Sequence, residues 1–352
     1  MPARMLARFC AVVTIPGLVV CLGCASAPSG PPPVLSCPTP IQVVSPDNNP
    51  VPVTYQAPVA SGSQPVPATC APSSGSLFAI GTTAVGCSAT VSENRVSCSF
   101  NVTVAPPPHL EKTRTLAFGD SITFGSDALC PFGPTGLQWT PAEFLRPWEG
   151  LAAIAAPYPR VLEGLLRERY TAQSPVVVNA GVPGESANAS DTRRRFTRAL
   201  TEHAPEVLLL QEGINDLHGL DFYGIPHNQG ISNLVAALRA MSLEARGRGV
   251  HVFLGTLLPE RPNGCRAFGI PPKGTMDLIT PTNNSIRGMA AAENIDLIDL
   301  ATLFTGQVDA LIGQDGLHPN EAGHAAIAKA FFDAIRAKFE RPIATAALTH
   351  RR

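Results

Sequence analysis

The sequence predicts an α/β fold, in which a parallel sheet is covered by helices on both faces, preceded by a small all-β sandwich. From Thr113 onward, apolar strands alternate with amphipathic helices, the pattern that buries a parallel sheet between two helical layers. Before Ala105 the pattern is different, because short strands of alternating polar and apolar residues follow one another with turn residues between them. A run of three prolines, Pro106, Pro107 and Pro108, separates the two patterns as a stiff linker.

The composition narrows the classes of partner. A chain of 352 residues has room for about two domains. Its formal net charge of −1 gives no electrostatic reason to expect nucleic acid or an anionic membrane surface as a partner. The histidines and acidic residues show no metal-ligand spacing, so neither a metal nor another cofactor is expected.

Residues 1–24 have the pattern of an export signal. Arg4 and Arg8 supply a positive end, and the apolar run Ala11–Gly23 that follows is too short to span a bilayer comfortably. We therefore expect an exported protein, located in a bacterial cell envelope or secreted.

The end of this signal resembles a bacterial lipobox, because small residues precede Cys24, although Cys21 stands where that motif usually has leucine. The resemblance implies that Cys24 carries a lipid and anchors the protein to a membrane. Cleavage after Ala27, which would release the protein, is the alternative. Residues 25–34 then form a Pro/Ser/Gly tether.

Residues 35–105 predict the sandwich, whose short strands leave a small core that disulfides would support. An exported protein is exposed to oxidising conditions, in which disulfides form. Three of the nine cysteines belong to the leader, and the other six form an even number, as paired cysteines would. These six are Cys37, Cys70, Cys87, Cys98, Cys130 and Cys265.

The segment from Cys37 to the strand that follows Cys98, with Cys70 and Cys87 between them, resembles the hyalin-repeat (HYR) domain, an immunoglobulin-like module. The resemblance implies the disulfides Cys37–Cys98 and Cys70–Cys87, although four cysteines alone permit three connectivities. We expect this domain to act as a spacer, with contact to a glycan or a surface as the alternative.

Residues 113–342 predict the α/β domain, between a linker at 106–112 and a tail at 343–352. The expected strands are Thr115–Phe118, Val176–Asn179, Val207–Gln211, Val250–Leu254 and Ile295–Ile298. The expected helices are Pro159–Tyr170, Asp191–His203, Ile231–Arg246, Asn283–Glu293 and Glu321–Phe339.

Chemically suitable residues follow the first three of these strands, where sites form in parallel sheets. Ser121 follows a sharp turn at Gly119 and Asp120, and a helix starting there would place its hydroxyl beside its backbone N–H. A nucleophile needs that geometry, because nearby N–H groups hold the oxyanion that forms. Gly184 follows the second strand and Asn215 the third, and both are natural oxyanion donors.

Asp315 and His318 lie between the last strand and the last helix. Their three-residue spacing across a turn lets Asp315 accept a hydrogen bond from one ring nitrogen, while the other nitrogen faces the serine. The structural alternative is that Ser121 only caps a helix, that Gly184 and Asn215 are turn residues, and that His318 only begins the last helix.

The segments Gly119–Ser121, Gly184, Gly213–Asp216 and Asp315–His318 are similar, in identity and order, to the four sequence blocks of the SGNH/GDSL hydrolases. The resemblance implies a flavodoxin-like three-layer α/β/α fold and hydrolysis of acyl esters without a metal. It also implies the roles of the residues. Ser121 would be the nucleophile, His318 the general base and Asp315 its orienter, and the N–H groups of Ser121 and Gly184 would form the oxyanion hole with the Asn215 amide.

Two long loops, Gly125–Pro159 and Pro259–Gly274, follow the first and fourth strands and are expected on the side of this site. Each carries one cysteine, so we expect a Cys130–Cys265 disulfide that holds the loops over the cleft. Aromatic residues of the first loop are candidates for a substrate pocket, and a small satellite core under the loop is the alternative. A histidine beside the third block is a further candidate, and a solvated loop residue is the alternative for it. The pocket candidates are Phe132, Trp139, Trp148 and His218.

The sequence therefore predicts an exported serine esterase that acts through an acyl-enzyme intermediate. The expected substrate is a small acyl or aryl ester, an acetylated glycan or a lipid. The alternatives are a polysaccharide O-deacetylase or a lysophospholipase or lipase of the same family, and a surface adhesion protein whose hydrolase domain is inactive.

Overall fold

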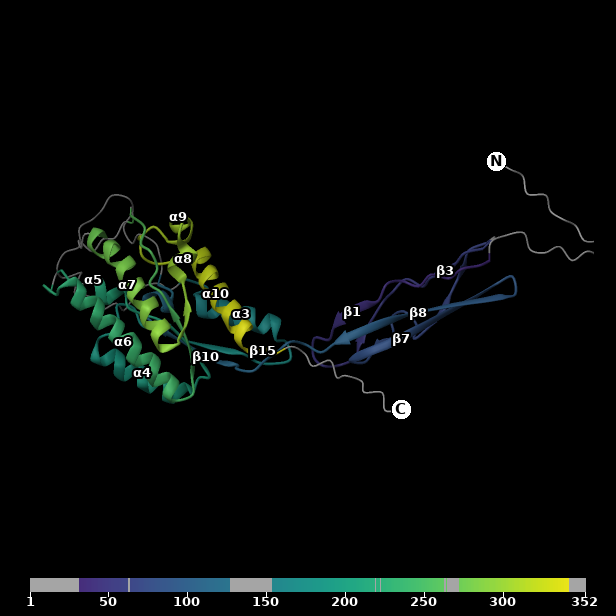
Figure 1. The fold of residues 1–352 in the computed structure, drawn as a ribbon, viewed down its shortest axis with the longest axis horizontal. Helices are drawn as coiled ribbons and strands as arrows, with labels where there is room; N and C mark the ends of the chain where they lie inside the picture. Colours follow the sequence, from purple (N-terminus) through teal and green to yellow (C-terminus); the bar gives the residue numbers. More distant parts are fainter. Residues whose placement is uncertain are drawn as a thin grey trace, which may run out of the picture. The chain divides into compact units, whose positions relative to one another are not determined.

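The computed structural model describes residues 32–62, 64–126, 154–218, 220–221, 223–262, 264 and 272–341. They form two compact units that divide after Ala105 (Figure 1). Among these residues, no helix combines the length and the apolar character that a membrane span requires. Several predictions fall outside them: the leader with Cys24, the pocket candidates Phe132, Trp139 and Trp148, and the Cys130–Cys265 disulfide.

The first unit is built on a four-stranded sheet in which the long strands β7 (Gly81–Val91) and β8 (Asn94–Ala105) form an antiparallel hairpin. Only two residues, Ser92 and Glu93, connect them, and both have positive φ, as a tight two-residue hairpin turn requires. In sheet order the strands are β1 (Ile41–Val44), β8, β7 and β5 (Thr69–Ala71), and β1 runs parallel to β8. Two short antiparallel pairs complete the unit: β2 (Val51–Pro52) with β6 (Leu77–Phe78), and β3 (Val59–Ala60) with β4 (Val66–Pro67).

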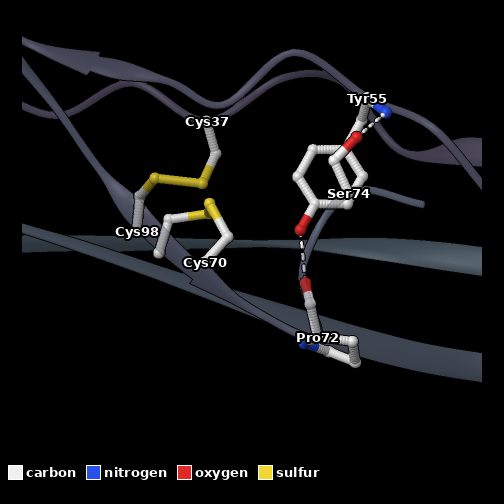
Figure 2. Close-up of a disulfide and its surroundings, with 7 residues drawn as sticks. Cys37, Tyr55, Cys70, Pro72, Ser74 and Cys98 are labelled. Atoms are coloured by element: carbon white, nitrogen blue, oxygen red, sulfur yellow. Dashed lines mark hydrogen bonds between the residues drawn. A yellow bond between two sulfur atoms is a disulfide. The ribbon is translucent and has the colours of Figure 1, made fainter. Parts of the chain in front are cut away.

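Two disulfides hold this sandwich together, and they are the pairs that the HYR resemblance implied: Cys37–Cys98 and Cys70–Cys87. Cys87 faces Cys70 on one neighbouring strand and Cys98 on the other, so the two bridges lie next to each other (Figure 2). Figure 2 also shows Tyr55, whose hydroxyl donates a hydrogen bond to the backbone carbonyl of Pro72. One bridge joins β5 to β7 and the other ties the segment before β1 to β8, and the small apolar core alone would hold these parts weakly.

The second unit contains a five-stranded parallel sheet. Its order is β11 (Val176–Gly181), β10 (Arg114–Gly119), β12 (Val207–Gln211), β13 (His251–Gly255) and β14 (Asp296–Ile298). By position along the chain this is the order 2-1-3-4-5, which is the flavodoxin-like arrangement. The central strands are largely apolar, and all five residues of β12 are buried, because helices cover both faces.

The helices form two layers (Figure 1). α3 (Tyr158–Arg169) packs against α10 (Glu321–Phe339) in one layer, while α4 (Ser190–His203), α6 (His227–Gly247) and α7 (Pro272–Glu293) form the other. Four shorter helices lie in connecting segments of the described residues; the argument for Ser121 invoked a helix starting there, and the other three were not predicted. They are α1 (Ser121–Phe124), α5 (Ile214–His218), α8 (Leu300–Phe304) and α9 (Val308–Leu311).

The prediction for α7 was wrong at its start. The helix was expected from Asn283, but it begins at Pro272 and runs through Pro281. Proline removes one hydrogen bond from a helix and commonly marks a boundary, and Pro281 lies two residues before the expected start. Here tertiary packing maintains the helix, since Leu278, Ile279 and Ile286, on both sides of Pro281, are buried in the core.

A short antiparallel pair closes the second unit where the chain enters and leaves it. β9 (His109–Leu110) pairs with β15 (Glu340–Arg341), directly after α10 ends. Arg169 fixes this pair with a bidentate contact to the Glu340 carboxylate, at 2.5 and 2.7 Å.

Candidate active site

The sheet order brings three of the predicted site loops together. β10 lies between β11 and β12 and runs parallel to both, so the loops that carry Ser121, Gly184 and Asn215 leave the same edge of the sheet side by side. The strand order reverses between β10 and β12, and ligand sites of open α/β sheets form at such a point.

The backbone around Ser121 is closely packed against both neighbouring strands. A side chain at Gly119 would place its Cβ 1.9 Å from the Gln211 carbonyl oxygen, and one at Gly181 would lie 2.1 Å from the Phe124 nitrogen. Glycine is therefore required at both strand ends. The Asp120 carboxylate then accepts the Ile122 N–H at 2.9 Å and caps α1, which fixes the first residue of that helix, Ser121.

Ser121, His318 and Asp315 form a continuous hydrogen-bonded chain. The Ser121 Oγ lies 2.8 Å from His318 Nε2. On the other side of the ring, His318 Nδ1 contacts a carboxylate oxygen of Asp315. The ring is thus held between a hydroxyl and a carboxylate. In this arrangement Nε2 can take a proton from the hydroxyl, and the carboxylate beside Nδ1 stabilises the imidazolium that forms.

Asp315 is itself fixed by the turn that it starts. Its Oδ1 accepts the backbone N–H groups of Leu317 and His318, each at 3.0 Å, and Gly316 supplies the positive φ of 85° that the turn requires. Burial alone would raise the pKa of the Asp315 carboxyl, but the hydrogen bonds from His318 and the backbone outweigh it, and the pKa lies below its usual value. Asp315 therefore stays ionised beside the imidazole.

The loops that carry Gly184 and Asn215 are bonded to each other. The Asn215 side chain donates one amide hydrogen to the Glu185 carbonyl at 2.8 Å. Next to it, the Asp216 carboxylate accepts the backbone N–H groups of Ala187 and Asn188 at 2.7 and 2.9 Å. Gly184 has a φ of 77°, a conformation that favours glycine. These contacts leave the second amide hydrogen of Asn215 available to a ligand.

Buried acidic residues surround the base of the site, and one of them, Glu212, was not identified from the sequence. Burial raises the pKa of Asp120 to about 6 and that of Asp216 to about 6, in both cases against hydrogen bonds from backbone N–H groups. Glu212 is fully buried, and neither of its carboxyl oxygens has a hydrogen-bond partner. Burial first, and the neighbouring carboxyl groups of Asp120, Glu185 and Asp216 second, raise its pKa well above the usual value.

Two further histidines lie near this part of the sheet. His218, a predicted pocket residue, ends α5, and its Nε2 lies 3.1 Å from the carboxylate of the buried Glu260. His324 lies inside α10 and is buried, and burial lowers its pKa to about 4. Its Nδ1 accepts the Tyr158 N–H at 3.2 Å. In the described part of the chain, no group of three His, Cys, Asp or Glu side chains is arranged to hold a metal ion.

Comparisons with known proteins find similarity for both units. The family model described as GDSL-like Lipase/Acylhydrolase family matches residues 117–326, and that of the HYR domain matches residues 30–104. A search among curated proteins finds no match.

Solved structures also resemble the chain. A lipase/acylhydrolase from Enterococcus faecalis is 20% identical with a TM-score of 0.48, covering 65% of this chain and 97% of its own. An acetylxylan esterase from Geobacillus stearothermophilus is 21% identical with a TM-score of 0.47, covering 64% of this chain and 95% of its own.

Proposed function

Because this chain belongs to the GDSL-like lipase/acylhydrolase family, we propose that it is a serine esterase that hydrolyses carboxylic acyl esters through an acyl-enzyme. The observation that carries the proposal is the hydrogen-bonded chain of Ser121, His318 and Asp315, with 2.8 Å between Ser121 Oγ and His318 Nε2. A serine hydroxyl is a weak nucleophile by itself, and an adjacent base activates it.

The first half of the proposed reaction acylates Ser121. As Oγ bonds to the ester carbonyl carbon, His318 Nε2 takes the hydroxyl proton and the π electron pair moves to the carbonyl oxygen. The Ser121 and Gly184 N–H groups and the free amide hydrogen of Asn215 receive that oxyanion. When the intermediate collapses, the alcohol leaves with the proton from His318, and the acyl group stays on Oγ.

The second half reverses these roles with water as the nucleophile. His318 takes a proton from water as the water oxygen bonds to the acyl carbon. Collapse of the second intermediate breaks the bond to Oγ, which recovers its proton from His318, and the acid is released. In both halves the ionised Asp315 stabilises the imidazolium, and the lowered pKa of the Asp315 carboxyl supports this role.

The test is hydrolysis of p-nitrophenyl acetate, octanoate and palmitate and of acetylated xylan by the full chain, with Ser121→Ala as the nucleophile variant. The exposed Ser190 serves as a matched control through Ser190→Ala. We expect turnover by the wild type and Ser190→Ala and loss of it in Ser121→Ala. Wild-type rates in Ser121→Ala would refute the nucleophile assignment, and binding of glycans without hydrolysis of any ester would support the adhesion alternative.

The ester series also separates the substrate classes. A preference for acetate and release of acetate from xylan would favour a polysaccharide O-deacetylase. A preference for palmitate would favour a lipase or lysophospholipase, because a long acyl chain gains from apolar burial.

We further propose that the protein is exported and anchored through a lipid on Cys24, on the basis of the leader sequence. In this arrangement the HYR domain would act as a spacer. Growth of an expressing bacterium with radiolabelled palmitate should label the wild type and not Cys24→Ala. Label on neither, with protein in the medium, would favour secretion after cleavage at Ala27.

A further inference from the structure

Arg195, in the middle of α4, reaches the ends of two strands and the loop after β11. Its Nη1 donates to the Ala180 carbonyl at 2.8 Å, and its Nη2 lies 3.5 Å from the Gly119 carbonyl. Nε lies 2.9 and 3.0 Å from the two oxygens of the Glu185 carboxylate, and Nη2 also contacts that carboxylate. All three guanidinium nitrogens are thus used, each toward the edge of the sheet that carries Ser121.

Each of these partners is connected to at least one proposed oxyanion donor. Gly119 precedes Ser121 by two residues at the end of β10. Ala180 lies at the end of β11, before the loop that holds Gly184, and Glu185 directly follows Gly184. The Glu185 backbone carbonyl also accepts the Asn215 amide at 2.8 Å. Arg195 is therefore linked to all three donors without being one itself.

The surroundings of Arg195 make it rigid. The guanidinium carbon lies 3.9 Å from the centre of the Phe118 ring, and the side chains of Arg195 and Glu185 are 18% and 11% exposed. The planar fork of arginine suits this combination of stacking and paired contacts, which lysine cannot reproduce. Arg195 also brings a positive charge beside the buried carboxyl group of Glu212 and the partly buried one of Glu185.

We propose that Arg195, with Glu185, is the positioning residue that sets the geometry of the oxyanion hole. It acts through the Gly184–Glu185 loop and Asn215 and touches no reacting atom. The inference rests on the proposed esterase function. Since oxyanion donors act in the transition state, loss of Arg195 should lower kcat and leave KM nearly unchanged.

The test is the rate at which a fluorophosphonate labels Ser121 in the full chain. In this reaction Oγ bonds to phosphorus, fluoride leaves, and His318 takes the hydroxyl proton, so the rate reports the oxyanion hole whichever ester is the substrate. The variants are Arg195→Met and Arg195→Lys. The control is Arg198→Met, which removes an exposed arginine from the same helix. A thermal unfolding curve for each variant checks the fold.

We expect labelling to slow about 10- to 100-fold in Arg195→Met and less in Arg195→Lys, with Arg198→Met within twofold of the wild type. If Arg195→Met unfolds, Arg195→Lys, which keeps the stem and the charge, carries the test. kcat and KM for p-nitrophenyl acetate should show the loss in kcat. Labelling of a folded Arg195 variant at the wild-type rate would overturn the proposal.

A double-mutant cycle with Asn215→Ala distinguishes positioning from a general structural effect. If Arg195 acts through Asn215, its removal should cost at least fivefold less once the amide is already absent, because coupled residues are not additive. Effects that multiply as for independent sites would contradict this. A wild type whose Ser121 is labelled but which cleaves no ester would refute the esterase function alone, whereas failure to label Ser121 at all would refute both.

Discussion

Replacement of Asp315 by asparagine isolates what the carboxylate contributes to the imidazole. Asp315 Oδ1 accepts two backbone N–H groups at 3.0 Å, from Leu317 and His318, and its other oxygen contacts His318 Nδ1. In Asp315→Asn the amide oxygen should keep the place of Oδ1, since an NH2 group there would oppose two donors. The amide NH2 then faces Nδ1.

The magnitude follows from this geometry. An NH2 donor facing Nδ1 selects the tautomer that carries its proton on Nε2, 2.8 Å from Ser121 Oγ, and that nitrogen can no longer accept the serine proton. Such a tautomer lowers kcat by about 10⁴ in serine proteases. The variant can escape only by flipping the amide, which loses two backbone contacts at about 1–3 kcal/mol each, or about 2–6 kcal/mol. At about 1.4 kcal/mol per tenfold, the expected loss in kcat is about 30-fold to 10⁴-fold.

The assay is steady-state hydrolysis of p-nitrophenyl acetate, with kcat and KM determined separately and thermal unfolding as the check on folding. Asp333→Asn is the matched control, because Asp333 pairs with Lys329 on the outer side of α10. A folded Asp315→Asn protein within tenfold of the wild-type kcat would refute the argument that this carboxylate selects the tautomer of His318.

Three further predictions concern the oxyanion donor, the buried acid and the disulfides. Asn215→Ala should lower kcat for p-nitrophenyl acetate about 10²- to 10³-fold with little change in KM, and an effect on KM alone would argue against an oxyanion donor. The pKa of Glu212 is raised in the folded protein. The free energy of unfolding is therefore unaffected by ionisation of this carboxyl below its unfolded pKa of 4.5, and it falls as pH rises through the folded pKa. Urea unfolding should therefore show Glu212→Gln gaining stability over the wild type from pH 4.5 to pH 8, and a constant difference would contradict this. Removing Cys37–Cys98, which closes 61 residues, should destabilise the first unit by about 4 kcal/mol, against about 3 kcal/mol for Cys70–Cys87, which closes 17. Hydrogen exchange of β7 and β8 in urea measures both, and the reverse order would contradict the loop-length argument.

The sequence was most informative where local signals agreed. The strand Val207–Gln211 and the helix Glu321–Phe339 were predicted with the bounds that the structure has. The first has four apolar residues in succession before Gln211, and the second has Asn320 as an N-cap that accepts the Gly323 N–H. The start of α7 was missed: Pro281 lies inside this helix, where tertiary packing overrides the usual preference of proline for helix boundaries.

At the site, the sequence placed Ser121 after a strand and Asp315 and His318 before the last helix, and the structure brings the three within contact of each other. Their catalytic roles stay predictions. Arg195 was missed because it lies in a run of three arginines, which is more simply interpreted as a solvated helix face. Helical periodicity could have found it, since it lies three residues after the buried Thr192 and four before the buried Ala199.

The pairing of β9 with β15 means that the two ends of the α/β unit are neighbours in space. When the two ends of a unit are neighbours, they can be linked to each other and new ends can be opened in another loop. A short Gly/Ser linker from Arg341 to His109 should therefore give a circular permutant that keeps the sheet order. The same feature makes the unit a transferable module. It could be inserted into a loop of a host protein, because both junctions leave it at one place.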